Sequence, residues 1–220
     1  MGRNSAAPEL VHRPIGERTT FTVIDAALGA RILAAAAGSD PWDAAVHLAL
    51  GLGLRREEVL GLAWEHVSDG VVRVRRTLTA ANGELHFGPP KSNAGRRDLP
   101  TPGFVARALQ RHHAAQGERM LALGTRTDLV IDNGLGQPWQ PASFSGAWTD
   151  FAKAQGFAGI TFHNLRHGAA TLLLAAGVPD TVAMRTMGHA DTRILARYQD
   201  VVSELQRDAA ARMDALLGGG

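Results

Sequence analysis

The segment TFHNLRHGAAT, residues 161–171, says most about the fold and the chemistry of this chain. Thr161 is a residue type that caps helices, and the pattern after it predicts a helix over about 162–176. On that helix His163 and Arg166 lie one turn apart on the same face, near the positive end of the helix dipole. This arrangement favours an anion site, although a surface helix with scattered basic residues has the same pattern.

A second informative segment is Gly188-His189, which is followed nine residues later by Tyr198, the single tyrosine of the chain. Gly188 suits the end of a helix expected over about 180–188, and another helix is expected over about 192–217. Taken alone, His189 is typical of a turn and Tyr198 of the edge of a core.

Two further basic segments lie upstream. Arg55 begins an expected helix with an acidic first turn, where Arg55 and Glu58 would also suit an ordinary ion pair. Lys91 lies in PPKSNAGRR, residues 89–97, a basic loop between expected strands. By itself, this loop is typical of a solvated turn.

The remaining sequence predicts mostly helices and one small sheet. Further helices are expected over 21–37, 41–52, 103–122 and 141–155. Between them, Val72 and Val74 alternate with arginines in a first expected strand, and Asn82-Gly83 is a typical hairpin turn before a second strand at residues 85–87. Arg96–Pro100 is a candidate third strand. We therefore expect a mostly α fold with a small antiparallel three-stranded β-sheet.

Composition narrows the functional classes. The chain of 220 residues contains no cysteine, which excludes disulfides and thiolate metal sites. It has no apolar run near the ~20 residues of a membrane span and no signal segment at its start, so we expect a cytoplasmic protein without a membrane partner. Lysine occurs only at Lys91 and Lys153 beside many arginines, which grip phosphate bidentately; a GC-rich genome would produce the same bias.

Taken together, the basic residues and the tyrosine resemble the active-site set of the tyrosine recombinase (phage integrase) family. In chain order this set is Arg55, Lys91, His163, Arg166, His189 and Tyr198. The surroundings are similar too: Gly53-Leu54-Arg55-x-x-Glu58 with Leu62-x-Trp64, Pro90-Lys91-Ser92 with Arg97, and His163-x-Leu165-Arg166-His167. Each motif alone is weak, but six matching positions in order are specific, and the resemblance spans about residues 21–200.

The resemblance implies a site-specific recombinase that cleaves and rejoins DNA through a covalent 3′-phosphotyrosyl intermediate. The host would be a bacterium, and the source a phage or another mobile element. Tyr198 would be the nucleophile, and Lys91 would protonate the departing 5′-oxygen. Such a reaction needs no metal and no nucleotide cofactor.

The other four residues would act on the scissile phosphate. Arg55 and Arg166 would clamp it through charge-assisted hydrogen bonds from planar guanidinium groups. His163 and His189 would hydrogen-bond it, and His163 is the better candidate to accept the tyrosine proton.

The sequence also departs from the family pattern. Met187 stands where leucine is common, Gly95 where serine is common, and Gly168 where threonine is frequent. None of these changes removes a group expected at the phosphate. Family members usually carry an N-terminal DNA-clamping domain, whereas here residues 1–20 read as a linker or arm, so we expect a catalytic domain without its core-binding domain.

The expected partner is double-stranded DNA, bound by a homo-tetramer as the resemblance implies. Residues 201–220 carry an apolar stripe at helical spacing, which would pack on the domain's own core or on a neighbouring subunit. Accessory DNA-bending or directionality proteins are compatible with this interpretation.

Three alternatives stay open. A type IB topoisomerase-like enzyme would use the same chemistry to relax DNA, and a non-catalytic module would bind DNA without forming an adduct. A metal-dependent hydrolase would use His163 and His167, one turn apart, with His189 as a third ligand, but the glutamate of an HExxH motif is missing.

Overall fold

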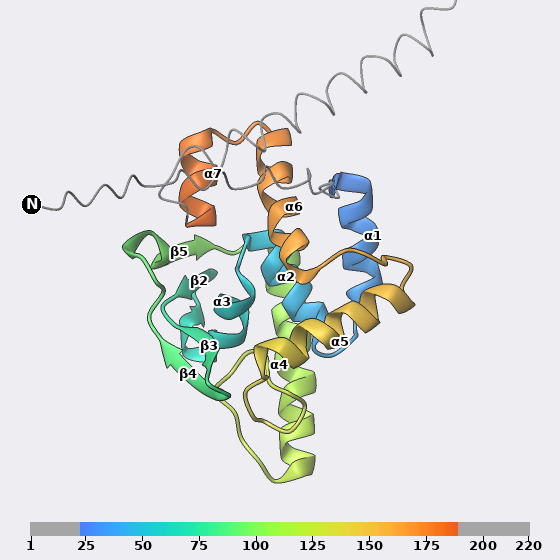
Figure 1. Ribbon diagram of the computed structural model, residues 1–220, viewed down its shortest axis with the longest axis vertical. Coiled ribbons are helices and arrows are strands. Elements are labelled where there is room, and N and C mark those ends of the chain that lie inside the picture. Colours follow the sequence, from blue (N-terminus) through green and yellow to red (C-terminus); the bar gives the residue numbers. More distant parts are fainter. Residues whose placement is uncertain (1–22, 189–220) are drawn as a thin grey trace, which may run out of the picture.

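The computed structural model describes residues 23–188, shown in Figure 1. Within them the helices are α1 (Ala26–Ala36), α2 (Trp42–Leu52), α3 (Arg56–Gly61), α4 (Gly103–Leu123), α5 (Pro141–Ala154), α6 (Phe162–Ala175) and α7 (Asp180–Met187). The strands are β1 (Val67–Ser68), β2 (Val71–Val74), β3 (Thr77–Ala81), β4 (Glu84–Gly88) and β5 (Arg97–Pro100). The helix expected over 192–217, His189, Tyr198 and the tail lie outside the described residues.

The strands form two small antiparallel sheets. A small three-stranded antiparallel sheet is present, with β2 in the middle: Val72 lies between Val67 of β1 and Leu99 of β5. Its membership differs from the prediction, because the strand expected at residues 85–87 belongs to β4 outside this sheet and β1 takes its place. The turn at Asn82-Gly83 does not join this sheet, because it connects β3 and β4 as a separate hairpin. In β3 the only buried residue is Leu78, so this strand lacks the alternation that would have revealed it.

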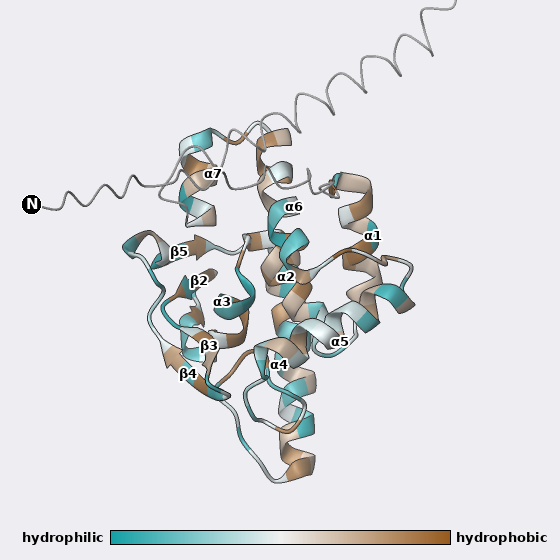
Figure 2. Ribbon diagram, in the orientation of Figure 1, coloured by the Kyte–Doolittle hydropathy of each residue, from teal (hydrophilic) through white to brown (hydrophobic). Residues whose placement is uncertain are grey.

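The core is built around α2. Every residue from Trp42 to Leu50 is buried, and the helix packs against α1, α4 and α6. Figure 2 shows mainly hydrophobic residues along α2. A mainly apolar helix that is buried on all sides lies inside a layer of other elements, which is the position of α2 in Figure 1.

An aromatic cluster fixes the beginning of α6. Phe162, the first residue of this helix, meets Phe144 of α5 edge to face with ring centroids 4.9 Å apart. Trp148 donates its indole N–H to the Ile160 carbonyl at 2.8 Å, and its ring lies 5.5 Å from that of Trp42 in α2. The start of the helix that carries His163 and Arg166 is therefore held by large buried rings.

Two of the departures from the family pattern have a packing explanation. At Gly168 in α6, an added Cβ would lie 2.8 Å from the Cβ of Ile24, so glycine allows the close approach of the N-terminal segment. At Gly95, an added Cβ would lie 2.6 Å from the Cβ of Pro90, which closes the loop around Lys91. Among residues 23–188, no helix is both long and apolar enough to cross a membrane.

Candidate active site

Arg55 lies at the N-terminus of α3 and is tied to Glu58. Its guanidinium donates to the Glu58 carboxylate at 2.9 Å, and its backbone N–H donates to the other carboxylate oxygen at 2.9 Å. The ion pair considered from the sequence is therefore present. The pair holds one edge of the guanidinium. The Arg55 side chain is still 35% exposed, whereas that of Glu58 is 1% exposed.

Glu58 is the centre of a larger arginine cluster. Arg97 of β5 donates to both carboxylate oxygens at 3.0 Å, and a guanidinium nitrogen of Arg166 lies 3.9 Å from one of them. Burial alone would raise the pKa of Glu58, but the hydrogen bonds and charge of Arg97, with help from Arg55 and Arg166, hold that pKa below its usual range. Glu58 is therefore ionised and anchors three cations.

Arg166 reaches this cluster from α6. Thr161 caps the helix as expected, with its hydroxyl accepting from the Asn164 N–H at 3.2 Å. The cap sets the start of the helix and so places Arg166 in its second turn, where the side chain is 3% exposed. The guanidinium donates to the carbonyls of Gly53 and Met187.

The three arginines meet the C-terminal end of α7. Arg97 donates to the Thr186 carbonyl at 2.7 Å, Arg166 to that of Met187, and Arg55 to that of Gly188 at 3.4 Å. Helix ends leave such carbonyls without partners and favour positive charge. Gly188 ends the helix in the left-handed conformation, as expected from the sequence. Gly188, the last described residue, thus lies at the arginine cluster and directly precedes His189 in the sequence.

His163 lies at the exposed start of α6. It lines a cavity of about 360 Å³ together with Arg56 and Glu57, and its ring meets that of His167 edge to face at 4.4 Å. Partial desolvation lowers the pKa of His163, and the positive charges of Arg166, Arg55 and Arg56 lower it further against the opposing effect of Glu57. The imidazole is therefore biased towards its neutral form, which can accept a proton.

Lys91 lies in the loop between β4 and β5. It is exposed and lines a cavity of about 390 Å³ that also includes Arg55, Glu57 and Glu58. Glu57 lines both this cavity and the one beside His163, so both cavities adjoin α3. The structure thus gathers Arg55, Lys91, His163 and Arg166 into one region; His189 and Tyr198 lie outside the described residues.

The charge of the cluster suits an anion. The single carboxylate of Glu58 faces the positive charges of Arg55, Arg97 and Arg166. Positive charge therefore exceeds negative charge within this group, and the adjacent cavity is lined by Lys91 and by Glu57, which is itself paired with Arg56. A phosphodiester carries one negative charge and presents oxygens that guanidinium groups bind well.

Comparison with known proteins identifies the family. Residues 29–204 match the model of the phage integrase family. The chain belongs to this family. The tyrosine recombinase resemblance of the sequence is thereby confirmed, and so is the fold class.

Individual relatives support the assignment of this chain to the phage integrase family. An integrase of Saccharopolyspora erythraea is 30% identical over 132 residues, which cover 59% of this chain and 30% of the relative. The prophage integrase IntR of Escherichia coli K12 is 29% identical over 185 residues, covering 75% of this chain and 44% of the relative. This chain therefore spans less than half the length of either relative.

A solved structure shows the shared fold. The Tn1549 transposon integrase, in complex with transposon right end DNA, matches with a TM-score of 0.68 at 21% identity, over 85% of this chain and 66% of that chain. The phage integrase family member thus shares a fold with a protein crystallised on DNA.

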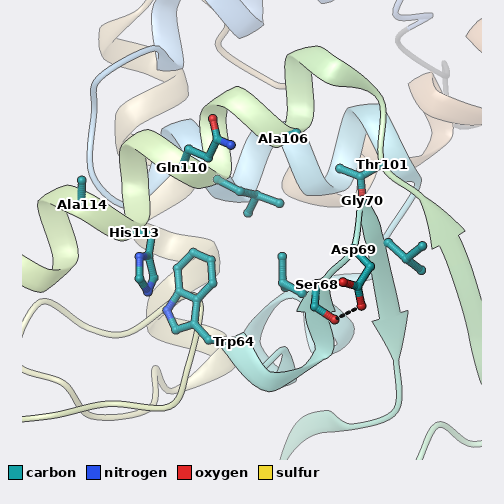
Figure 3. Close-up of a pocket in the computed structure, with 12 residues that line it drawn as sticks. Trp64, Ser68, Asp69, Gly70, Thr101, Ala106, Gln110, His113 and Ala114 are labelled. Carbon is teal, nitrogen blue, oxygen red and sulfur yellow. Dashed lines mark hydrogen bonds between the residues drawn. The ribbon is translucent and has the colours of Figure 1, made fainter.

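Another cavity lies away from the arginine cluster. It has a volume of about 450 Å³ between α4 and the β1–β2 turn, and Figure 3 shows Trp64, Gln110 and His113 at its wall. Trp64 meets His113 edge to face at 4.4 Å, and Ser68 donates to Asp69 at 3.0 Å. None of the predicted site residues lines it, so we place the candidate site at the arginine cluster despite the smaller cavities there.

The sequence missed the roles of two residues. In the sequence Glu58 and Arg97 are only motif neighbours of Arg55 and Lys91, yet they form the buried centre of the site. The local signal for a buried carboxylate was weak: Glu58 directly precedes the apolar residues Val59 and Leu60. Across the described part of the chain, no three His, Asp or Glu residues gather as a metal site; the metal alternative includes His189, which lies beyond it.

Proposed function

We propose that this chain cleaves and rejoins double-stranded DNA as a site-specific tyrosine recombinase. The observation that carries this proposal is the pairing of Arg55 and Arg166, from two helices distant in sequence, around Glu58 and beside the loop of Lys91. This arrangement supplies what phosphoryl transfer requires most, namely preorganised positive charge at a fixed place. Family membership supports the same reaction.

In the proposed reaction the scissile phosphate binds at the open side of the arginine cluster. Arg55 and Arg166 contact its non-bridging oxygens, and His189 adds a hydrogen bond. Because a free tyrosine has a pKa near ~10, these positive charges also favour the phenolate at the moment of attack.

The transfer itself exchanges one phosphorus–oxygen bond for another. The Tyr198 oxygen bonds to phosphorus while the bond from phosphorus to the 5′-oxygen breaks. His163 takes the phenol proton, and Lys91 gives a proton to the leaving 5′-oxygen. Attack by a 5′-hydroxyl reverses these steps and rejoins the strand, so the energy of the phosphodiester bond is conserved.

The wider biological role is part of the proposal. The two relatives are integrases by name, and one of them is a prophage integrase. We place this chain likewise in a phage or another mobile element of a bacterium, acting in the cytoplasm where the DNA lies. Exchange between two duplexes needs several active sites, for which we propose a homo-tetramer on DNA, with accessory bending or directionality proteins as further partners.

The deciding experiment traps the covalent intermediate. The wild-type protein and Tyr198→Phe are incubated, with and without a chelator, with a pool of nicked suicide duplexes that carry randomised half-sites. We expect a protein–DNA band on a denaturing gel from the wild type alone, because no second tyrosine can substitute. DNA binding without a band favours a binding module, relaxation of supercoiled plasmid without strand exchange favours the topoisomerase alternative, and chelator-sensitive cleavage favours the metal alternative.

A further inference from the structure

Arg97 makes more polar contacts than its place in a sheet requires. It is the first residue of β5, where its backbone pairs with Val74, and its side chain is 4% exposed. The guanidinium donates to both oxygens of Glu58 at 3.0 Å, to the Gly95 carbonyl at 3.1 Å and to the Thr186 carbonyl at 2.7 Å. A buried arginine with this many partners holds them in a fixed geometry.

Each of these partners belongs to a segment that carries a proposed functional side chain. Glu58 holds Arg55 by a second pair of hydrogen bonds. Gly95 ends the loop that contains Lys91, and Thr186 lies three residues before His189. Arg97 therefore links the phosphate clamp, the general-acid loop and the segment leading to the nucleophile.

The lysine loop and the end of α7 also touch each other at Arg97. A Cβ added to Gly188 would lie 3.0 Å from the Ala94 carbonyl oxygen and 3.0 Å from a guanidinium nitrogen of Arg97. Figure 1 shows α7 beside β5, in agreement with their contacts. The three segments thus meet at one buried side chain, whose removal would free all of them together.

We propose that Arg97 is a positioning residue for DNA strand cleavage. It fixes Glu58, the Lys91 loop and the C-terminal end of α7 relative to one another, and it touches neither the phosphate nor the leaving oxygen. This inference rests on the proposed recombinase function. It predicts that replacing Arg97 slows the phosphoryl-transfer step while DNA stays bound.

The test compares Arg97→Lys and Arg97→Gln with the wild type and with Arg119→Lys as a matched control. Arg119 also forms ion pairs within the domain, with Asp40 and Asp132, but on α4 and away from the cluster. For each protein we would measure urea unfolding, DNA affinity, the rate of covalent adduct formation at saturating DNA, and amide hydrogen exchange by mass spectrometry.

We expect both Arg97 variants to bind DNA as the wild type does and to form the adduct about a hundredfold more slowly, the usual effect of a small misplacement of reacting groups. Peptides covering residues 91–97 and 184–188 should exchange faster, because the Gly95 and Gly188 amides there lose their support. Exchange in α4 should stay unchanged. Arg97→Lys keeps the charge but has a single side-chain nitrogen, which cannot reach all the acceptors of the guanidinium. Its adduct rate should therefore be closer to that of Arg97→Gln than to that of the wild type.

The proposal fails if either variant forms the adduct at the wild-type rate with unchanged exchange in both segments. It also fails if both variants lose cooperative unfolding, or lose DNA binding in proportion to cleavage, because Arg97 would then serve the fold as a whole. Should the wild type itself form no adduct, the recombinase function is refuted, while the exchange data still decide whether Arg97 holds the two segments.

Discussion

Arg97 and Glu58 form a buried, bidentate ion pair in which both nitrogen–oxygen distances are 3.0 Å. Their side chains are 4% and 1% exposed, so water screens the pair little. Arg55 and Arg166 approach the same carboxylate, from α3 and from α6. The position of the proposed phosphate clamp thus depends on a residue pair that is itself buried.

Replacing Glu58 by glutamine should destabilise the fold strongly. Three guanidinium groups would face one another without a counter-charge, and breaking a buried ion pair costs about 3–5 kcal/mol. Urea unfolding of Glu58→Gln measures this loss. Glu57→Gln is the matched control, because Glu57 is 32% exposed and its pair with Arg56 should contribute less than about 1 kcal/mol. Equal losses in both variants would contradict the central role of Glu58.

The same carboxylate predicts how stability depends on pH. The folded-state pKa of Glu58 is lowered, so its contribution to stability is fully present above the usual glutamate pKa and is lost as the pH falls through the folded-state value. Wild-type stability should therefore decline from about pH 4.5 downwards, towards that of Glu58→Gln. Urea unfolding at a series of acidic pH values measures both curves. Two curves that stay parallel below this pH would show that Glu58 is not ionised in the fold.

Lys91→Ala should slow cleavage by removing the proton donor for the 5′-oxygen. A substrate with a 5′-thiol leaving group needs no such proton, because thiolates leave unprotonated near neutral pH. Adduct formation by Lys91→Ala should therefore approach the wild-type rate on the thiol substrate. Lys153→Ala, which removes the only other lysine, is the control and should behave as the wild type on both substrates. If Lys91→Ala still forms the adduct more slowly than the wild type on the 5′-thiol substrate, Lys91 acts in DNA binding instead.

The rate of adduct formation should keep its maximum to an unusually low pH. His163 must be neutral to accept the tyrosine proton, and its pKa is lowered from the ordinary value of 6.5. The acidic limb of the rate profile should thus lie below that value, and Arg56→Gln should shift it upwards, because the Arg56 charge helps to lower the pKa. Single-turnover rates between about pH 5 and 8 give the profile. An acidic limb that survives in His163→Gln would exclude His163 as the base.

Replacing Gly168 by threonine, the residue frequent in the family at this position, should destabilise this protein. An added Cβ there would meet Ile24 at 2.8 Å and a Leu50 methyl at 3.1 Å, in a core without room to yield. Gly168→Thr should therefore lower stability by about 1–3 kcal/mol through overpacking. Thermal unfolding measures the change. Gly146→Thr on α5 separates this effect from helix propensity, since nothing lies within 4 Å of a Cβ at Gly146. A Gly168→Thr protein as stable as this control would contradict the packing explanation.

Local sequence patterns predicted most of the helices because each of them depends on neighbouring residues. Thr161 caps α6, and Gly188 ends α7, where the sequence placed them. The first helix was expected from residue 21 but begins at Ala26, where the Asp25 carboxylate accepts from the Leu28 N–H at 2.7 Å. Propensity alone did not reveal this boundary, because alanine-rich residues continue a helical pattern without marking its start.

The sequence by itself determined the fold class, the order of the basic residues and their chemical types, since these are properties of local pattern and composition. Only the tertiary structure decided that Glu58 joins Arg55, Arg97 and Arg166, and that the end of α7 lies on these three arginines. The physical reason is that a buried ion pair forms only where segments distant in the sequence pack together and exclude water from the charged groups. Arg97 is 39 residues from Glu58 and 89 from Thr186, separations at which no sequence periodicity carries information.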